Sequence, residues 1–156
     1  MPPPPETPLL TQIAMGTVLL TINITLAAVA AMALEVAFQK LHPWFLREPH
    51  RPKLVLLVAG VSLWLLGVIT LGVWVWAGAY LWLGAFATLE EAVYFSIVAF
   101  TTLGLGDIVL PQDWRILAGM EAANGFINFG LLCALFIEAL RQIRLGQVEL
   151  RRKTRE

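Results

Sequence analysis

The sequence is poor in charged side chains. Only 14% of its 156 residues are Asp, Glu, Lys or Arg, whereas 58% are hydrophobic, and the mean hydropathy is +0.75. A soluble domain carries about 25% charged residues, so this composition excludes an ordinary soluble protein and indicates a membrane protein. Acidic and basic residues balance at 11 each. Without a basic excess, the sequence does not favour nucleic acid as a partner.

Cysteine and catalytic groupings are also scarce. Cys133 is the single cysteine, so no disulfide can form within the chain, and its apolar surroundings indicate packing rather than redox chemistry. The sequence contains no nucleophile–base pair and no metal-ligand spacing, which argues against an enzyme and against a cofactor. No apolar run carries arginine at every third position, so we expect no voltage sensor of the usual kind. The segment after residue 140 is too short for a ligand-binding domain.

Long apolar runs are the main feature that the chain does have. A helix needs about 20 apolar residues to cross the bilayer core, and three runs qualify: Leu9 to Phe38, Leu54 to about Tyr80, and Ile116 to Leu140. The first run is expected to be retained, because the preceding MPPPPETP lacks the positive charge of a secretory signal. The sequence therefore predicts an all-α membrane protein with three transmembrane helices. Residues 1–38 form the N-terminal segment and first helix.

Basic residues gather in two segments of the chain. Four lie within residues 39–53 and six within 141–156, out of 11 in total. Because basic residues collect on the cytoplasmic side of a membrane, we expect a cytoplasmic loop at 39–53 and a cytoplasmic tail at 141–156, both able to attract anionic lipids. The N-terminus and residues 81–115 are then outside a cell (plasma or inner) membrane.

The connection between the second and third runs is too apolar for an external loop. Residues 88–100 predict a short helix, because Thr88 and Glu91 fit a T-x-x-E capping box. The rest of this helix, AVYFSIVAF, is apolar but too short to cross the bilayer. We therefore predict a re-entrant segment, in which the helix enters from outside and TTLGLGD at 101–107 leads the chain back.

The loop at 101–107 has glycine at alternate positions. If successive carbonyl groups are to point to one side, the backbone must enter regions of positive φ, and Gly104 and Gly106 allow this at little cost. The carbonyl oxygens of residues 102–105 would then face one axis, with the Thr102 hydroxyl below them. Rings of oxygen atoms can replace the hydration shell of a cation.

At these residues the chain resembles the potassium channel pore-domain family, whose filter signature is T-x-G-[YFL]-G-D after a short pore helix. Residues 102–107 read TLGLGD and follow Thr101, and GFINFGLL at 125–132 resembles the stretch around the family's hinge glycine. The resemblance covers about residues 54–140. It implies an outer helix, a pore helix at 88–100, a filter at 102–106 and an inner helix at 116–140. The filter residues are Thr102, Leu103, Gly104, Leu105 and Gly106, and the first four would bind the permeant K⁺.

The chain departs from the family pattern at two positions. Most members have tyrosine or phenylalanine in place of Leu105, so an aromatic ring that supports the filter is missing. Val98 stands where some members have a glutamate that pairs with the filter aspartate. We expect a hydrogen bond from Tyr94 to Asp107 to replace that pair, with Thr101 also supporting the filter.

The third apolar run contains both polar residues and glycines. Glu121, Asn124 and Asn128 form an i, i+3, i+7 stripe on one helix face. Glu121 could support the pore helix from behind, sense protons, or simply bond to a neighbouring helix as a neutral acid. The inner-helix residues expected at the cavity or hinge are Gly125, Phe126, Phe129, Gly130 and Cys133. Either glycine could serve as a hinge or as a close-packing site.

One pore loop cannot enclose an axis, so the family resemblance implies a homotetramer. The first helix is additional, and its alanines, from Ala27 to Ala33, are expected to pack it outside the second helix. The sequence thus predicts a potassium-selective channel. Two alternatives stay open: a non-selective monovalent cation channel, if Leu105 loosens the filter, and a non-conducting accessory membrane subunit. The sequence does not identify the gating stimulus.

Overall fold

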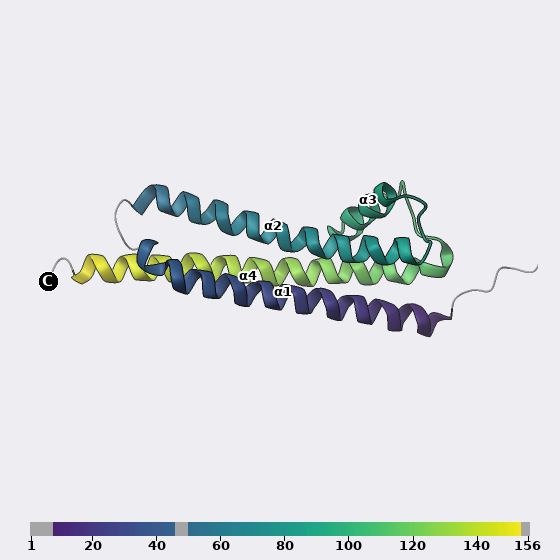
Figure 1. Cartoon of the computed structure of the whole chain (residues 1–156), viewed down its shortest axis with the longest axis horizontal. Helices are drawn as coiled ribbons and strands as arrows, with labels where there is room; N and C mark the ends of the chain where they lie inside the picture. Colours follow the sequence, from purple (N-terminus) through teal and green to yellow (C-terminus); the bar gives the residue numbers. More distant parts are fainter. Residues whose placement is uncertain (1–7, 46–49, 154–156) are drawn as a thin grey trace, which may run out of the picture.

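The computed structural model describes residues 8–45 and 50–153, and within these ranges it is helical with no strand. The elements are α1 (Leu9–Phe45), α2 (His50–Trp82), α3 (Leu89–Phe100), a single 3₁₀ turn η1 (Gln112–Trp114) and α4 (Arg115–Lys153). The three long helices run side by side, and α3 lies at the end of the bundle where α1 begins (Figure 1). The expected all-α membrane fold is confirmed.

Three helical segments are long and apolar enough to cross a membrane. They are Leu9–Lys40, Val55–Trp82 and Gln112–Arg141, close to the three runs that the sequence predicts. α3 is much shorter than these and lies between the second and third segments. The protein is therefore an integral membrane protein with a short helix between its last two spans.

The segments expected to be a cytoplasmic loop and a cytoplasmic tail are largely helical in the described residues. α1 continues to Phe45 and α2 already begins at His50, so most of the expected loop at 39–53 extends these two helices. α4 likewise continues through Lys153, well into the expected tail at 141–156. An apolar run marks where a helix leaves the bilayer but does not end the helix, because backbone hydrogen bonds also form in water.

The short helix α3 forms as the sequence predicts. The Glu91 backbone N–H donates to the Thr88 hydroxyl at 3.2 Å, and Thr88 has the extended backbone of an N-cap. Glu90 and Glu91 place negative charge in the first turn, where the helix dipole favours it. Phe95 and Phe100 are buried against the neighbouring helices, so one face of α3 is covered by protein, whereas Ile97 on another face is 48% exposed.

The first helix packs differently from the expectation. α1 packs more extensively against α4 than against α2. Gly16 allows this contact, since its Cα lies close to the Met120 and Leu117 side chains of α4. Ala27 is 1% exposed, whereas Ala28 and Ala33 are exposed. Small residues permit close helix contact on any face, so an alanine-rich stretch alone does not decide which neighbour the helix meets.

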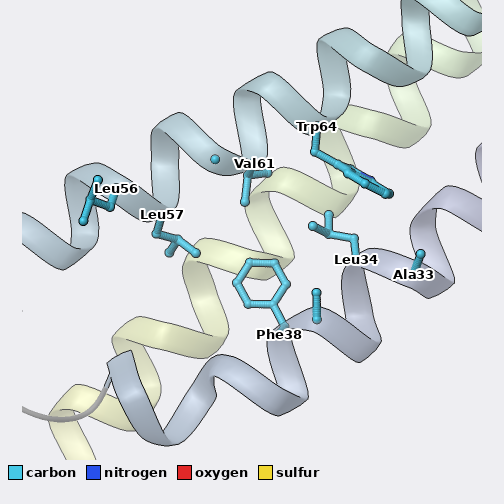
Figure 2. Close-up of a pocket in the computed structure, with 9 residues that line it drawn as sticks. Ala33, Leu34, Phe38, Leu56, Leu57, Val61 and Trp64 are labelled. Atoms are coloured by element: carbon cyan, nitrogen blue, oxygen red, sulfur yellow. The ribbon is translucent and has the colours of Figure 1, made fainter.

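An apolar groove separates parts of α1 and α2, toward the end of the bundle away from α3 (Figure 2). Leu34 and Phe38 of α1 face Leu57 and Val61 of α2 across it. The Trp64 indole N–H bridges the two helices by donating to the Ala30 carbonyl at 3.3 Å. The main core lies at the opposite end, around Trp76 and Tyr80. The main core therefore packs against α3.

Candidate ion-conduction site

The candidate site begins where α3 ends. The Thr101 and Thr102 backbone N–H groups donate to the carbonyls of Ile97 and Ala99 at 3.0 and 2.9 Å, which closes the last turn of α3. The Thr101 hydroxyl also donates to the Ile97 carbonyl at 2.7 Å. Thr101 thus fastens the start of the loop to the helix, which fits the supporting position expected for it.

Residues 101–107, called the glycine loop below, have an alternating backbone. The φ angles of Gly104 and Gly106 are 59° and 77°, in the left-handed region that the sequence predicts for them. Thr102 also has a positive φ, 59°, which sequence reasoning missed. Such a φ is unusual for a β-branched residue and has to be held by its surroundings. Extending the two-residue period of the glycines back by one step would have indicated it.

The start of the glycine loop is also bonded back to α3. The backbone N–H groups of Leu103 and Gly104 both donate to the Val98 carbonyl, at 3.0 and 3.4 Å. These bonds turn the two amide groups toward α3. The loop residues are nevertheless exposed in the single subunit, and the Leu103 and Leu105 side chains are 63% and 59% exposed. In a membrane, irregular backbone of this kind has to be covered by protein or line a water-filled space.

Tyr94 and Asp107 form the hydrogen bond that the sequence predicts. The Tyr94 hydroxyl donates to Asp107 Oδ2 at 2.6 Å, which connects α3 to the far end of the glycine loop. This bond lowers the pKa of the Asp107 carboxyl and raises the pKa of the Tyr94 hydroxyl, because it stabilises the carboxylate and holds the phenol proton. The glycine loop is therefore anchored to α3 at both ends.

A hollow lies next to the base of the glycine loop. Thr101 and Thr102 line it together with Phe126 and Phe129 of α4. The structure thus brings the two expected cavity phenylalanines next to the loop. Cys133 is farther along the same exposed face of α4 and lines a second hollow, between α2 and α4.

The two glycines of α4 have different surroundings. A Cβ on Gly125 would collide with the Phe100 carbonyl oxygen, so Gly125 is a close-packing site against the end of α3. Gly130 has nothing within 4 Å of where a Cβ would be. α4 is a continuous helix through both positions. The sequence could not distinguish these two roles, because Phe100 is 25 residues away from Gly125 along the chain.

The polar stripe of α4 is buried behind α3. Glu121 is 0% exposed, and its Oε2 accepts a 2.7 Å hydrogen bond from the Tyr80 hydroxyl of α2. Asn128 Nδ2 donates to the Asn124 side-chain and backbone oxygens at 2.8 and 3.0 Å. Sequence reasoning missed Tyr80, and it missed Ser96 of α3, which is also 0% exposed and lies beside Glu121. Ser96 could have been found from the sequence, because it is a hydroxyl residue within the otherwise apolar stretch AVYFSIVAF.

Residues 68–142 match the model of a family described as "Ion channel". Over this range the chain is similar to that ion-channel family. The match runs from α2 through α3 and the glycine loop into α4, which is the order of a two-helix pore domain. The resemblance to the potassium channel pore-domain family is thereby confirmed, and α1 precedes the matched range. No curated protein and no solved structure gives a significant match to the chain.

Proposed function

We propose that this ion-channel protein is a potassium-selective channel that conducts through a homotetramer of glycine loops. The observation that carries the proposal is the alternation of positive φ at Thr102, Gly104 and Gly106 directly after α3. This alternation allows consecutive carbonyls to face one side, and the amides of Leu103 and Gly104 are held on the α3 side. Four such loops around an axis would form the oxygen rings that replace the hydration shell of K⁺.

Two exposed surfaces support a tetramer. The glycine loop is uncovered in one subunit, although a membrane requires cover for such backbone. The Phe126 and Phe129 side chains of α4 are 74% and 62% exposed next to the base of the loop. Fourfold cyclic symmetry would cover the loop with neighbouring copies and turn this face of α4 toward a central cavity.

The orientation of α3 supports cation conduction. Its C-terminal end, at Phe100, adjoins the hollow that Thr101 and Thr102 line. The C-terminal end of a helix carries a partial negative charge, which favours a cation at that point. A cation that waits below the glycine loop would thus be stabilised without a charged side chain.

The proposed topology follows from the charge distribution. The start of α1 lies at the same end of the bundle as α3 and the glycine loop (Figure 1). With the basic segments 39–53 and 141–156 in the cytoplasm, this end faces outward, so the N-terminus is outside and the C-terminus inside a cell membrane. Anionic lipids are the expected partners of the basic segments.

One observation favours a second candidate function, a non-selective monovalent cation channel. Leu105 is 59% exposed in the subunit, and it offers no hydroxyl or aromatic ring with which to brace the loop. A loop that can widen would discriminate less between K⁺ and Na⁺. The accessory-subunit alternative predicts no flux from the purified protein in any oligomeric state.

Flux measurements on liposomes that contain the purified protein test these functions. With opposed K⁺ and Na⁺ gradients, we expect barium-sensitive flux that follows K⁺ and a cross-linked species of four chains. Gly104→Ala should abolish the flux while the tetramer still forms, because alanine resists the positive φ. Leu105→Tyr should leave selectivity equal or better. Equal flux of both ions would support the non-selective channel, and unchanged flux in Gly104→Ala would overturn the proposed filter.

A further inference from the structure

Four buried side-chain atoms behind the glycine loop have no hydrogen-bond partner in the described part of the chain. They are Trp76 Nε1, Ser96 Oγ, Glu121 Oε1 and Asn124 Nδ2. They come from α2, α3 and α4, at the junction where these helices meet. Unpaired polar groups are costly inside a membrane protein, so this grouping requires a physical explanation.

Glu121 is the ionisable group of this junction. It is 0% exposed and lies within a membrane-spanning segment. Among the described residues no lysine, arginine or histidine forms an ion pair with it. A carboxylate without a counter-ion in such a site costs several kcal/mol, whereas a neutral carboxylic acid avoids this cost.

The groups that face Glu121 are polar but carry no positive charge. Tyr80 of α2 is a phenol that donates its proton to Oε2, and Ser96 of α3 presents a hydroxyl. α1 contributes apolar and amide groups near this end, since Glu35 and Lys40, its ionisable residues with described side chains, lie near its other end. Lys53 of α2 is likewise 27 residues before Tyr80 along that helix, and α3 contains no basic residue, so none of these three helices places a described cation next to Glu121.

The hydrogen-bond pattern also indicates where the proton lies. Oε2 already accepts the Tyr80 bond at 2.7 Å, so a proton on Oε1 leaves that bond intact. Oε1–H is then a donor, and the hydroxyl oxygen of Ser96 is an unpaired acceptor beside it. A hydrogen bond between these two groups thus provides partners for two of the four unpaired atoms, and a proton on Oε1 allows it without a buried charge.

We propose that Glu121 is a proton-binding site, which holds a proton on Oε1 and donates it in a hydrogen bond to Ser96 Oγ. The bond connects α4 to α3, so the proton acts as a structural ligand of the pore domain. Ser96 lies two residues before Val98, whose carbonyl holds the amides of Leu103 and Gly104. Loss of the proton would reverse this bond, so that the Ser96 hydroxyl donates to the carboxylate, and would leave a buried negative charge without a counter-ion behind the glycine loop.

This site would make conduction depend on pH, an expectation that rests on the proposed channel function. The junction is neutral when the proton is bound and gains a buried negative charge without a counter-ion as the pH rises, so flux should fall on the alkaline side. For a single proton the fall approaches about tenfold per pH unit. The exposed pair of Tyr94 and Asp107 changes on the acidic side instead, so the two effects are separable.

Infrared spectroscopy of the purified protein tests the site without any flux. At neutral pH we expect the carbonyl stretching band of a protonated carboxylic acid, distinct from that of a carboxylate. Glu121→Gln should remove this band, and Ser96→Ala should shift it because the hydrogen bond is lost. Glu35→Gln is the matched control, since Glu35 is exposed and should contribute no such band. A spectrum without a Glu121 acid band would overturn the proposal.

Flux measurements across pH then test the effect on conduction. The wild type and Glu35→Gln should lose flux as the pH rises, whereas Glu121→Gln should keep it, because the amide N–H₂ is a permanent donor to Ser96. The same alkaline loss in Glu121→Gln would overturn the link to conduction. If the acid band is present but no variant conducts, the channel function fails while the proton site stands.

Discussion

α4 buries its polar face and exposes its apolar face, which is the reverse of a helix in a soluble protein. On one face Glu121, Asn124 and Asn128 are 0%, 0% and 4% exposed. On the other face Phe126 and Phe129 are 74% and 62% exposed. A soluble helix buries its apolar face and solvates its polar one.

This difference indicates what each face is for. The polar face meets its partners within the subunit, from Tyr80 of α2 to Ser96 of α3. The apolar face meets few partners in the subunit and lies beside the base of the glycine loop. Polar residues within the membrane usually face the protein interior, so the polar stripe contributes to packing within the subunit. The apolar face is left available for contacts between subunits or for lining a cavity.

The largest effect is expected from the glycine on which α3 packs. Gly125→Ala places a Cβ against the Phe100 carbonyl oxygen, which is backbone and cannot rotate away. We expect a loss of about 1–3 kcal/mol or more in unfolding free energy, measured by thermal unfolding in detergent. Gly130→Ala is the matched control, and it should be neutral or slightly stabilising because its surroundings are open. Equal losses in both variants would contradict the close-packing role of Gly125.

The next effect concerns the exposed face of α4. Cys133 is exposed and is the single cysteine of the chain, so a cationic thiol reagent has one target. If this face lines an aqueous cavity, modification should remove most of the flux, since a bulky cation would obstruct the path. Cys133→Ser should be insensitive to the reagent. A labelled protein that conducts normally would place Cys133 away from the cavity.

A smaller effect is expected from the hydroxyl that binds the polar face. Tyr80→Phe removes the donor of the 2.7 Å bond to Glu121 and leaves the aromatic contacts with Phe86 and Phe95 in place. Loss of a buried donor costs about 1–3 kcal/mol, so the midpoint of thermal unfolding should fall. Phe126→Leu, on the exposed face, should change it little. Equal unfolding midpoints for Tyr80→Phe and Phe126→Leu would mean that the buried polar face of α4 does not contribute more to stability than its exposed apolar face.

The smallest effect is expected from the exposed hydrogen bond. Tyr94→Phe removes the bond that lowers the pKa of Asp107, so this pKa should rise toward the ordinary value of about 4. The contribution of the bond is present above the ordinary pKa and is lost as pH falls through the lowered pKa. Flux of the variant should therefore decline at a higher pH than that of the wild type during acid titration. Near neutral pH the two should be alike, and identical acid profiles would mean that Asp107 does not affect conduction.

Local signals in the sequence were sufficient for part of the candidate site. The capping box at Thr88 and the positive φ at Gly104 and Gly106 are present, as is the bond between Tyr94 and Asp107 that the family resemblance implied. The residues involved in each of these features are at most 13 positions apart along the chain. Local backbone preferences and short-range bonds act before long-range packing, so a sequence pattern can indicate them.

Distant contacts were not predictable in the same way. The bond of Tyr80 to Glu121 joins residues 41 positions apart, and the contact of Gly125 with Phe100 depends on how α3 meets α4. The more extensive packing of α1 against α4 than against α2 was also missed. An apolar helix in a membrane has many possible neighbours, and its hydrophobicity does not rank them.

The amino-acid sequence alone determined that the chain crosses a membrane, where its spans lie, and that a short capped helix leads into an alternating glycine loop. Hydrophobicity, capping and glycine conformation act locally, so these features do not depend on the rest of the fold. The tertiary structure alone decided that Gly125 is a packing site and that Tyr80 and Ser96 meet Glu121 behind the loop. These features depend on the close approach of helices from different parts of the chain, which packing geometry decides.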